Sequence, residues 1–156
     1  MNRRTELTVA VDVDAPAGTS WQTLTDWPAQ GEWMLGTTVR VIGGGAGRHA
    51  GARLHAVTGV GPIGIPDTME LVEWDPPRRC VVQHTGKIVR GAGVFEVVEL
   101  GPQRSQIVWT ELLELPLGVL GRLGWPVVRP LFRLGVRVSL DRLARRCAAA
   151  HRVGRA

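Results

Sequence analysis

The sequence has few of the residues that mark several common classes of functional site. Its 156 residues include no tyrosine, two phenylalanines, two cysteines and one lysine, Lys87. Without tyrosine, the inventory of side chains for acid–base chemistry is thin. Cys80 and Cys147 form neither a disulfide framework nor a CxxC site, so we expect each to be a small buried apolar residue.

Motifs for metal, nucleotide and hydrolase chemistry are absent as well. The serines do not occupy a GxSxG elbow, and the glycine-rich run 43–51 lacks the Lys-Ser/Thr continuation of a phosphate-binding loop. The run 59–64, GVGPIG, has the letters of a dinucleotide fingerprint, but Pro62 and Pro66 prevent the helix that this fingerprint needs. The histidines show no HExxH pair and no spacing suited to zinc: His49, His55, His84 and His151. We therefore expect no metal and no cofactor.

No segment of the sequence suggests a membrane span or a secretion signal. No run approaches the roughly 18 uninterrupted apolar residues of a spanning helix, and Arg3 and Arg4 are not followed by an apolar segment. Since neither a repeat nor a linker is visible, the length predicts one domain over residues 1–156, with a core from about residue 5 to residue 150. We expect a soluble, cytoplasmic protein.

The first two thirds of the chain have the pattern of an antiparallel sheet. Residues 6–13 alternate apolar and polar side chains, which predicts a strand with one buried face. Start signals at 16–20 then favour a short helix that carries Trp21 and Leu24 inward, and a second short turn is expected at 30–34. Six further strands, separated by turn residues, are expected at 37–42, 52–60, 67–74, 79–86, 94–100 and 105–114.

The segment 115–156 predicts one long helix with two apolar stripes. The first stripe, which has arginines opposite it at 129, 133 and 137, consists of Val127, Leu131, Leu134 and Val138. The second stripe, rotated well away from the first, consists of Phe132, Val136, Leu140, Leu143 and Cys147. Pro126 suits a first helical turn, and Pro130 either begins the regular helix or kinks it. We expect such a helix to be covered on two sides, one by the sheet and the other by a cavity, its contents or a partner, unless both stripes simply pack into the core.

Basic charge is concentrated in the same segment. It holds nine arginines and one acid, Asp141, which gives a net charge of +8, whereas the rest of the chain carries −3. A basic helical face can bind RNA or an anionic membrane surface, although a solvated face is the more common explanation. We expect no DNA binding, and any contact of this helix with RNA or an anionic membrane is expected to be transient.

The order of these elements resembles that of the START-like, or Bet v 1-like (SRPBCC), superfamily. The segment 15–33 is similar to the first helical segment of that superfamily, and 47–52 to its glycine-rich approach to the third strand. The run 73–79, EWDPPRR, resembles its acidic-Pro-Pro-Arg turn, and 107–110 resembles its last strand. The closest resemblance is to the polyketide cyclase/dehydrase and lipid-transport branch, over residues 5 to about 150.

The resemblance implies an α+β helix-grip fold, in which a bent seven-stranded antiparallel sheet wraps around the long C-terminal helix and two short helices follow strand one. A deep, largely apolar cavity would lie between sheet and helix, with 59–66 as a mobile loop at its mouth. One stripe of the helix would seal against the sheet and the other would line the cavity. The residues expected to contact a ligand there are Leu54, Met69, Leu71, His84, Phe95, Val97, Trp109, Glu111, Leu131, Leu134 and Val138. Which alternate residues of 67–74 face the inside of the sheet stays open.

Two ionisable side chains have the strand parity of the buried face. Glu111 shares the parity of Trp109, and His84 shares that of Val82. A charged group in an apolar cavity costs free energy unless it is paired, so each is a candidate for proton transfer or for holding the polar end of a ligand. The alternative for Glu111 is that it reaches solvent at the strand end or pairs with an arginine of the helix.

Three functions remain open at this point. The first is to bind or carry a hydrophobic small molecule of lipid, polyketide or aromatic type, without covalent chemistry. The second is an enzyme of the cyclase or dehydratase type, in which Glu111 or His84 transfers protons. The thin polar inventory weighs against the enzyme. The third is docking through the arginine-rich helix, and the oligomeric state, monomer or homodimer, stays open.

Overall fold

The computed structural model describes residues 4–114 and 119–155, so the expected start of the long helix at 115–118 lies outside the described residues. Seven strands form one antiparallel sheet in the order β1-β7-β6-β5-β4-β3-β2. The strands are β1 (Arg4–Val13), β2 (Thr37–Ile42), β3 (Arg53–Val60), β4 (Ile63–Asp75), β5 (Arg79–His84), β6 (Gly91–Gly101) and β7 (Arg104–Glu114).

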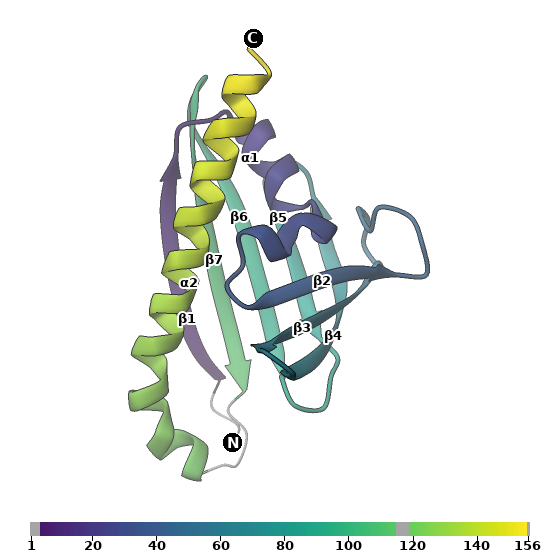
Figure 1. Cartoon of the computed structure of the whole chain (residues 1–156), viewed down its shortest axis with the longest axis vertical. Coiled ribbons are helices and arrows are strands. Elements are labelled where there is room, and N and C mark those ends of the chain that lie inside the picture. The colour runs from purple at the N-terminus through teal and green to yellow at the C-terminus, as the bar shows by residue number, and fades with distance from the viewer. Residues whose placement is uncertain (1–3, 115–118, 156) are drawn as a thin grey trace.

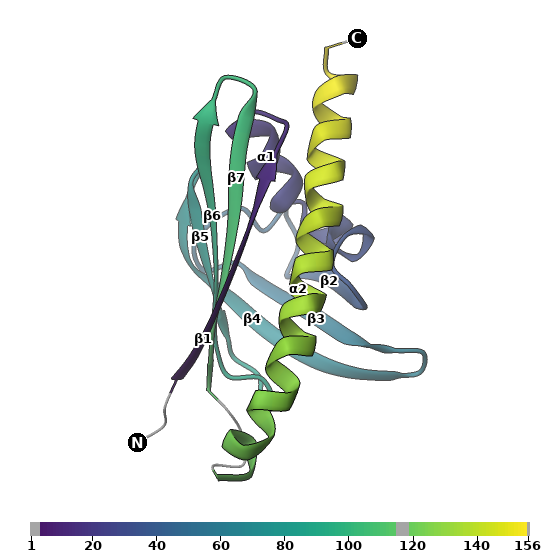
Figure 2. The same cartoon turned by 90° about the vertical axis from the view of Figure 1, so that its left-hand side faces the viewer.

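Two short helices and one long helix accompany the sheet. Helix α1 spans Ala17–Leu24, the 3₁₀ helix η1 spans Trp27–Glu32, and α2 spans Val119–Val153. Figure 1 shows α2 crossing the sheet beside β1 and β7, with α1 packed near its C-terminal half. In Figure 2, β1, β6 and β7 stand to the left of α2, while β3 and β4 extend behind the helix toward the right, so the sheet is strongly bent. The predicted α+β helix-grip fold is confirmed.

Alternation of side chains explains the strands. In β1, Leu7, Val9, Val11 and Val13 are buried, whereas the residues between them are mostly exposed. This one-sided burial is what a strand gains by packing one face on a core. On the opposite side of the sheet, Arg79 of β5 pairs with Glu73 of β4 at 2.9 Å and with Glu96 of β6 at 2.8 Å.

A β-bulge in β4 determines which of its residues face the core. The pairing of β4 with β5 shifts register between Leu71 and Glu73. A bulge places one extra residue on its strand, so the inward parity changes at that point. Leu71 is therefore fully buried, Val72 is 52% exposed, and Trp74 packs against the core. This bulge resolves the parity that the sequence pattern left open.

The segment 59–66 is a tight hairpin, and the expectation of a loop there is wrong. Strand β3 continues to Val60, β4 begins at Ile63, and Gly59 pairs with Gly64. A Cβ on Gly59 would lie 2.0 Å from the carbonyl oxygen of Ile63, so the close approach of the two strands requires glycine. The hairpin projects beside the cavity, and Figure 2 shows it extending away from α2.

The two apolar stripes of α2 have different surroundings from those expected. The second stripe packs on the sheet, with Val136, Leu140, Leu143 and Cys147 buried. The first stripe faces away from the sheet, and Val127, Leu131 and Leu134 are 70%, 68% and 60% exposed. Most of the first stripe is therefore not covered by the described part of the chain, although Leu131 lines the cavity between helix and sheet; cover of this stripe by a partner stays a prediction.

Pro126 and Pro130 both lie inside α2. Neither is in the first turn, since the helix begins at Val119. A proline inside a helix removes one backbone hydrogen bond and pushes the preceding turn away, which bends the helix. Figure 2 shows α2 changing direction in this N-terminal part, whereas its C-terminal part is straight.

Candidate functional site

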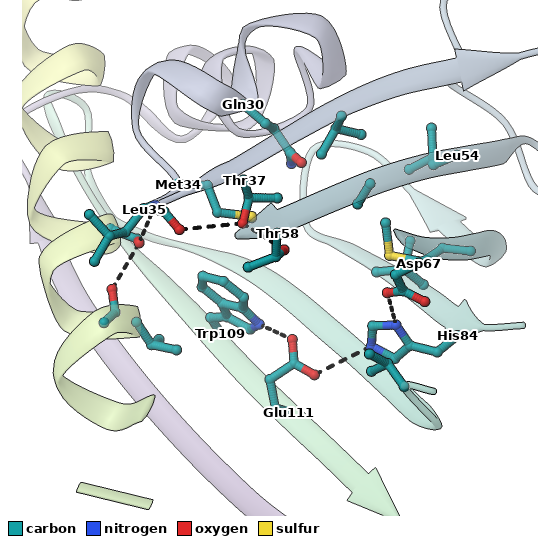
Figure 3. Close-up of a pocket in the computed structure, with 18 of the residues that line it drawn as sticks. Gln30, Met34, Leu35, Thr37, Leu54, Thr58, Asp67, His84, Trp109 and Glu111 are labelled. Carbon is teal, nitrogen blue, oxygen red and sulfur yellow. Dashed lines mark hydrogen bonds and ion pairs between the residues drawn. The ribbon is translucent and has the colours of Figure 1, made fainter. Parts of the chain in front are cut away.

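A cavity of about 500 Å³ lies between the concave face of the sheet and α2. Its walls come from η1, from strands β2 to β7 and from the middle of α2, and Figure 3 shows the residues that line it. Most of these side chains are apolar. Four aromatic rings from different elements take part: Trp27, Phe95, Trp109 and Phe132.

Seven of the residues expected to contact a ligand do line this cavity. They come from β3, β4, β5, β6, β7 and α2, and they are Leu54, Met69, His84, Phe95, Trp109, Glu111 and Leu131. Their side chains point inward because each has the strand or helix parity of the concave face.

Four of the expected residues lie outside the cavity wall. Leu71 and Val97 are on the inward face but are packed into the solid core at the end of the sheet where α1 lies. Leu134 and Val138 belong to the first stripe of α2, most of which faces away from the sheet, and these two residues do not line the cavity. The expectation of cavity lining is wrong for these four, because parity alone does not show where a core is filled and where it is hollow.

A cluster of three ionisable side chains occupies one side of the cavity (Figure 3). His84 on β5 lies between Asp67 on β4 and Glu111 on β7. Its Nδ1 lies 2.6 Å from Asp67 Oδ2, and its Nε2 lies 3.6 Å from Glu111 Oε2. Trp109 Nε1 donates a hydrogen bond of 2.6 Å to the other oxygen of Glu111, Oε1.

A glycine of β6 allows His84 and Glu111 to meet. Strand β6 runs between β5 and β7, with Gly91 opposite His84 and Gly93 opposite Glu111 in the two registers. A Cβ on Gly93 would lie 3.2 Å from Glu111 Oε1 and 3.3 Å from Val82 Cγ2. Because Gly93 carries no side chain, the carboxylate of Glu111 reaches across the intervening strand toward the imidazole.

The cluster is almost completely removed from solvent. Asp67 is 8% exposed and Glu111 is 7% exposed. Burial by itself lowers the pKa of His84, but the hydrogen bond to Asp67 and the negative charges of Glu111 and Asp67 outweigh burial and raise that pKa to about 9. His84 is therefore an imidazolium at neutral pH, held between two carboxylates.

Asp67 is the member of the cluster that sequence reasoning missed. It was expected only as the first residue of a strand, but it shares the inward parity of Met69, two residues further along β4. The other missed polar residues in the wall bond within the protein. Thr37 and Thr58 share a hydrogen bond of 2.9 Å between their hydroxyls, and Ser139 accepts from the backbone N–H of Leu35.

Other expected features can be placed as well. Cys80 and Cys147 are buried and free, and burial raises the pKa of both thiols, that of Cys80 to about 12. Within residues 4–114 and 119–155, no group of three or more histidine, cysteine or acidic side chains is arranged to hold a metal ion. No helix in the described part of the chain has the length and apolar composition needed to cross a bilayer.

The fold and the cavity define the class of protein: an α+β helix-grip protein with an internal chamber between its sheet and its C-terminal helix. The family model for polyketide cyclase / dehydrase and lipid transport proteins matches residues 4–148. The chain therefore belongs to this family. Among curated proteins, none matches the sequence.

Solved structures have the same fold at low sequence identity. A protein from Thermus thermophilus is 20% identical with a TM-score of 0.78, over 94% of this chain and 99% of that one. The Zhui aromatase/cyclase from Streptomyces sp. R1128 is 18% identical with a TM-score of 0.75, over 93% and 94%. A START superfamily protein from Mycobacterium smegmatis is 16% identical with a TM-score of 0.68, over 96% and 98%. These likenesses show the fold.

Proposed function

We propose that the protein binds or carries an apolar small molecule in this cavity, with the polar end of the molecule at the cluster of Asp67, His84 and Glu111. The observation that carries the proposal is a chamber of about 500 Å³ with mostly apolar walls and one buried ionisable cluster on one side. Apolar walls favour an apolar body, while a few placed polar groups fix its orientation. The family, which is described as one of polyketide cyclases and lipid-transport proteins, supports this interpretation.

The affinity would come from burial of apolar surface. At about 25 cal/mol per Å², removing a few hundred Å² of ligand surface from water supplies several kcal/mol, before the cost of ordering the ligand. No covalent step is required for such binding. Lipids, polyketides and aromatic compounds are the classes of molecule whose size and polarity fit this description.

Native mass spectrometry of freshly purified protein, followed by organic extraction, tests the proposal. We expect a stoichiometric apolar adduct, or uptake of the neutral dye N-phenyl-1-naphthylamine if the protein is purified empty. Ala56→Phe, which fills the cavity wall, would reduce uptake, and Ala149→Phe, an exposed position outside the cavity, would serve as the matched control. Absence of both an adduct and dye uptake in the wild type would refute the proposal.

A second candidate function is an enzyme of the cyclase or dehydratase type in the same cavity. The observation that favours it is the imidazolium of His84 at 3.6 Å from a buried carboxylate. In a dehydration, Glu111 would take the proton from carbon while His84 gives a proton to the departing hydroxyl, which leaves as water. His84→Gln and Glu111→Gln should then abolish turnover of a poly-ketone substrate and retain dye uptake; turnover that persists in both variants would exclude these roles.

Docking of α2 on RNA or on an anionic membrane stays a prediction. Its supporting observation is that two arginines, Arg129 and Arg133, are exposed along the same N-terminal part of α2 as the exposed apolar stripe. Electrostatic binding to either partner falls as salt rises. Sedimentation with anionic vesicles and with RNA, at low and at high salt, would show which partner is bound, and equal recovery in both salt conditions would dismiss an electrostatic contact.

A further inference from the structure

The charged groups inside the cavity do not balance. The described residues that line it include two carboxylates, Asp67 and Glu111, and one histidine, His84, but no lysine or arginine. With all three groups ionised, the cluster carries a net charge of −1. An unbalanced charge in an apolar chamber is costly and attracts a compensating charge.

The imidazolium of His84 is not directed at the space that a ligand would fill. Its Nδ1 donates to Asp67 Oδ2 at 2.6 Å, and its Nε2, which makes no hydrogen bond, faces Glu111 Oε2 at 3.6 Å. Both ring nitrogens are thus turned toward carboxylates of the protein. An anionic ligand would find the positive charge of the cluster already enclosed.

Other hydrogen-bond donors of the wall also bond inside the protein. Trp109 Nε1 donates to Glu111 Oε1, and Ser139 donates to the carbonyl of Gly135. The hydroxyls of Thr37 and Thr58 bond to each other. The wall therefore offers few free donors to a carboxylate or phosphate.

Acceptor capacity, in contrast, remains. A carboxylate oxygen has two lone pairs, and Glu111 Oε1 and Asp67 Oδ2 each accept one hydrogen bond in the structure. Among the described residues, Asp67 Oδ1 and Glu111 Oε2 are buried and accept no hydrogen bond. Trp109 bonds to Glu111, its ring centroid lies 5.1 Å from that of Phe95 in the cavity wall, and the face of an aromatic ring attracts a cation.

We propose that the polar end of the ligand is a hydrogen-bond donor, and in particular a protonated amine on an apolar body rather than a carboxylate. The inference rests on the proposed binding function and narrows it to one chemical class. An ammonium group brings donors and no acceptor, and its charge would reduce the net charge of the occupied cluster from −1 to zero. A hydroxyl group supplies one donor without the charge, so an alcohol ranks second. A carboxylate adds a second uncompensated negative charge and ranks last.

Displacement of N-phenyl-1-naphthylamine by three compounds with the same chain tests this ranking at neutral pH. Decylamine should displace the dye at a concentration about tenfold lower than decanoate, as expected for one charge-assisted contact, with decanol between them. Decanoate that displaces the dye as well as decylamine, or better, overturns the inference. If neither the dye nor any of the three compounds binds, the proposed function fails and the inference falls with it.

A matched pair of variants assigns the preference to the cluster. Glu111→Gln removes one negative charge in the cavity, and Glu99→Gln removes one from an exposed position of β6 outside it. The tenfold advantage of decylamine should be lost in Glu111→Gln and kept in Glu99→Gln. Asp67→Asn provides a second cavity variant with the same expected loss, and an advantage kept in both cavity variants would overturn the assignment to the cluster.

Discussion

His84 makes the stability of the fold depend on pH in a predictable direction. Its pKa is raised from 6.5 to about 9 in the folded protein. A group whose folded pKa is raised stabilises the fold fully below its unfolded pKa, near 6.5, and this contribution is lost as pH rises through the folded value. A shift of this size corresponds to about 3 kcal/mol. The side chain of His84 is only 9% exposed, so solvent screens the effect little.

Two measurements on the intact chain check this prediction. Chemical shifts of isotope-labelled histidine should show His84 titrating near pH 9. Urea unfolding at pH 6 and at pH 10 should show the stability advantage of wild type over His84→Gln shrinking by about 3 kcal/mol at the higher pH. The comparison cancels groups that titrate equally in both proteins. His49→Gln, at an exposed position, should show no such change.

Asp67→Asn extends the test to the cause of the shift. The amide retains an oxygen acceptor for His84 but removes one of the two charges that raise its pKa. The titration of His84 should therefore move toward 6.5, and the loss of stability between pH 6 and pH 10 should become smaller. Titration of wild-type His84 near 6.5, or a wild-type advantage over His84→Gln that is the same at both pH values, would refute the reasoning.

Further predictions concern packing and the hairpin. Leu140→Ala, at a fully buried position of α2, should lower the free energy of unfolding by about 2–5 kcal/mol. Leu134→Ala, at a position that is 60% exposed, should change it by less than about 0.5 kcal/mol. Equal effects of the two variants in urea unfolding would contradict the assignment of the two stripes. Gly59→Ala should destabilise the hairpin, because its Cβ would lie 2.0 Å from a backbone oxygen, and faster proteolysis between β3 and β4 would report it. Proteolysis at the wild-type rate would show that the strands can separate without cost.

The order and type of the elements follow from the sequence because alternation and turn residues are local signals. The same parity argument placed His84 and Glu111 on the concave face. It could not decide the orientation of residues beyond Leu71, since a bulge in β4 between Leu71 and Glu73 changes the parity and nothing in the sequence marks its position. The meeting of His84 with Glu111 also depends on Gly93 in a third strand, which is a property of register between strands.

The long helix shows a second limit of sequence reasoning. A helical wheel finds both apolar stripes of α2 but does not show which one the sheet covers, because the stripes containing Leu131 and Leu140 are similarly apolar. A helical wheel also does not show where the core contains a cavity. Val97 has the right parity for the cavity but lies where the core is filled.

The two halves of α2 are packed against the rest of the protein to different extents, so the chamber is closed firmly on one side and loosely on the other. Leu140, Leu143 and Cys147 are fully buried, so this half of the helix can detach only with much of the core. The half around Val127 and Leu131 is mostly exposed, yet it closes the chamber at Leu131 and Phe132. Amide hydrogen exchange should therefore be slow in the C-terminal half and fast in the N-terminal half, and local opening at Leu131 and Phe132 would give access to the chamber without unfolding the buried half.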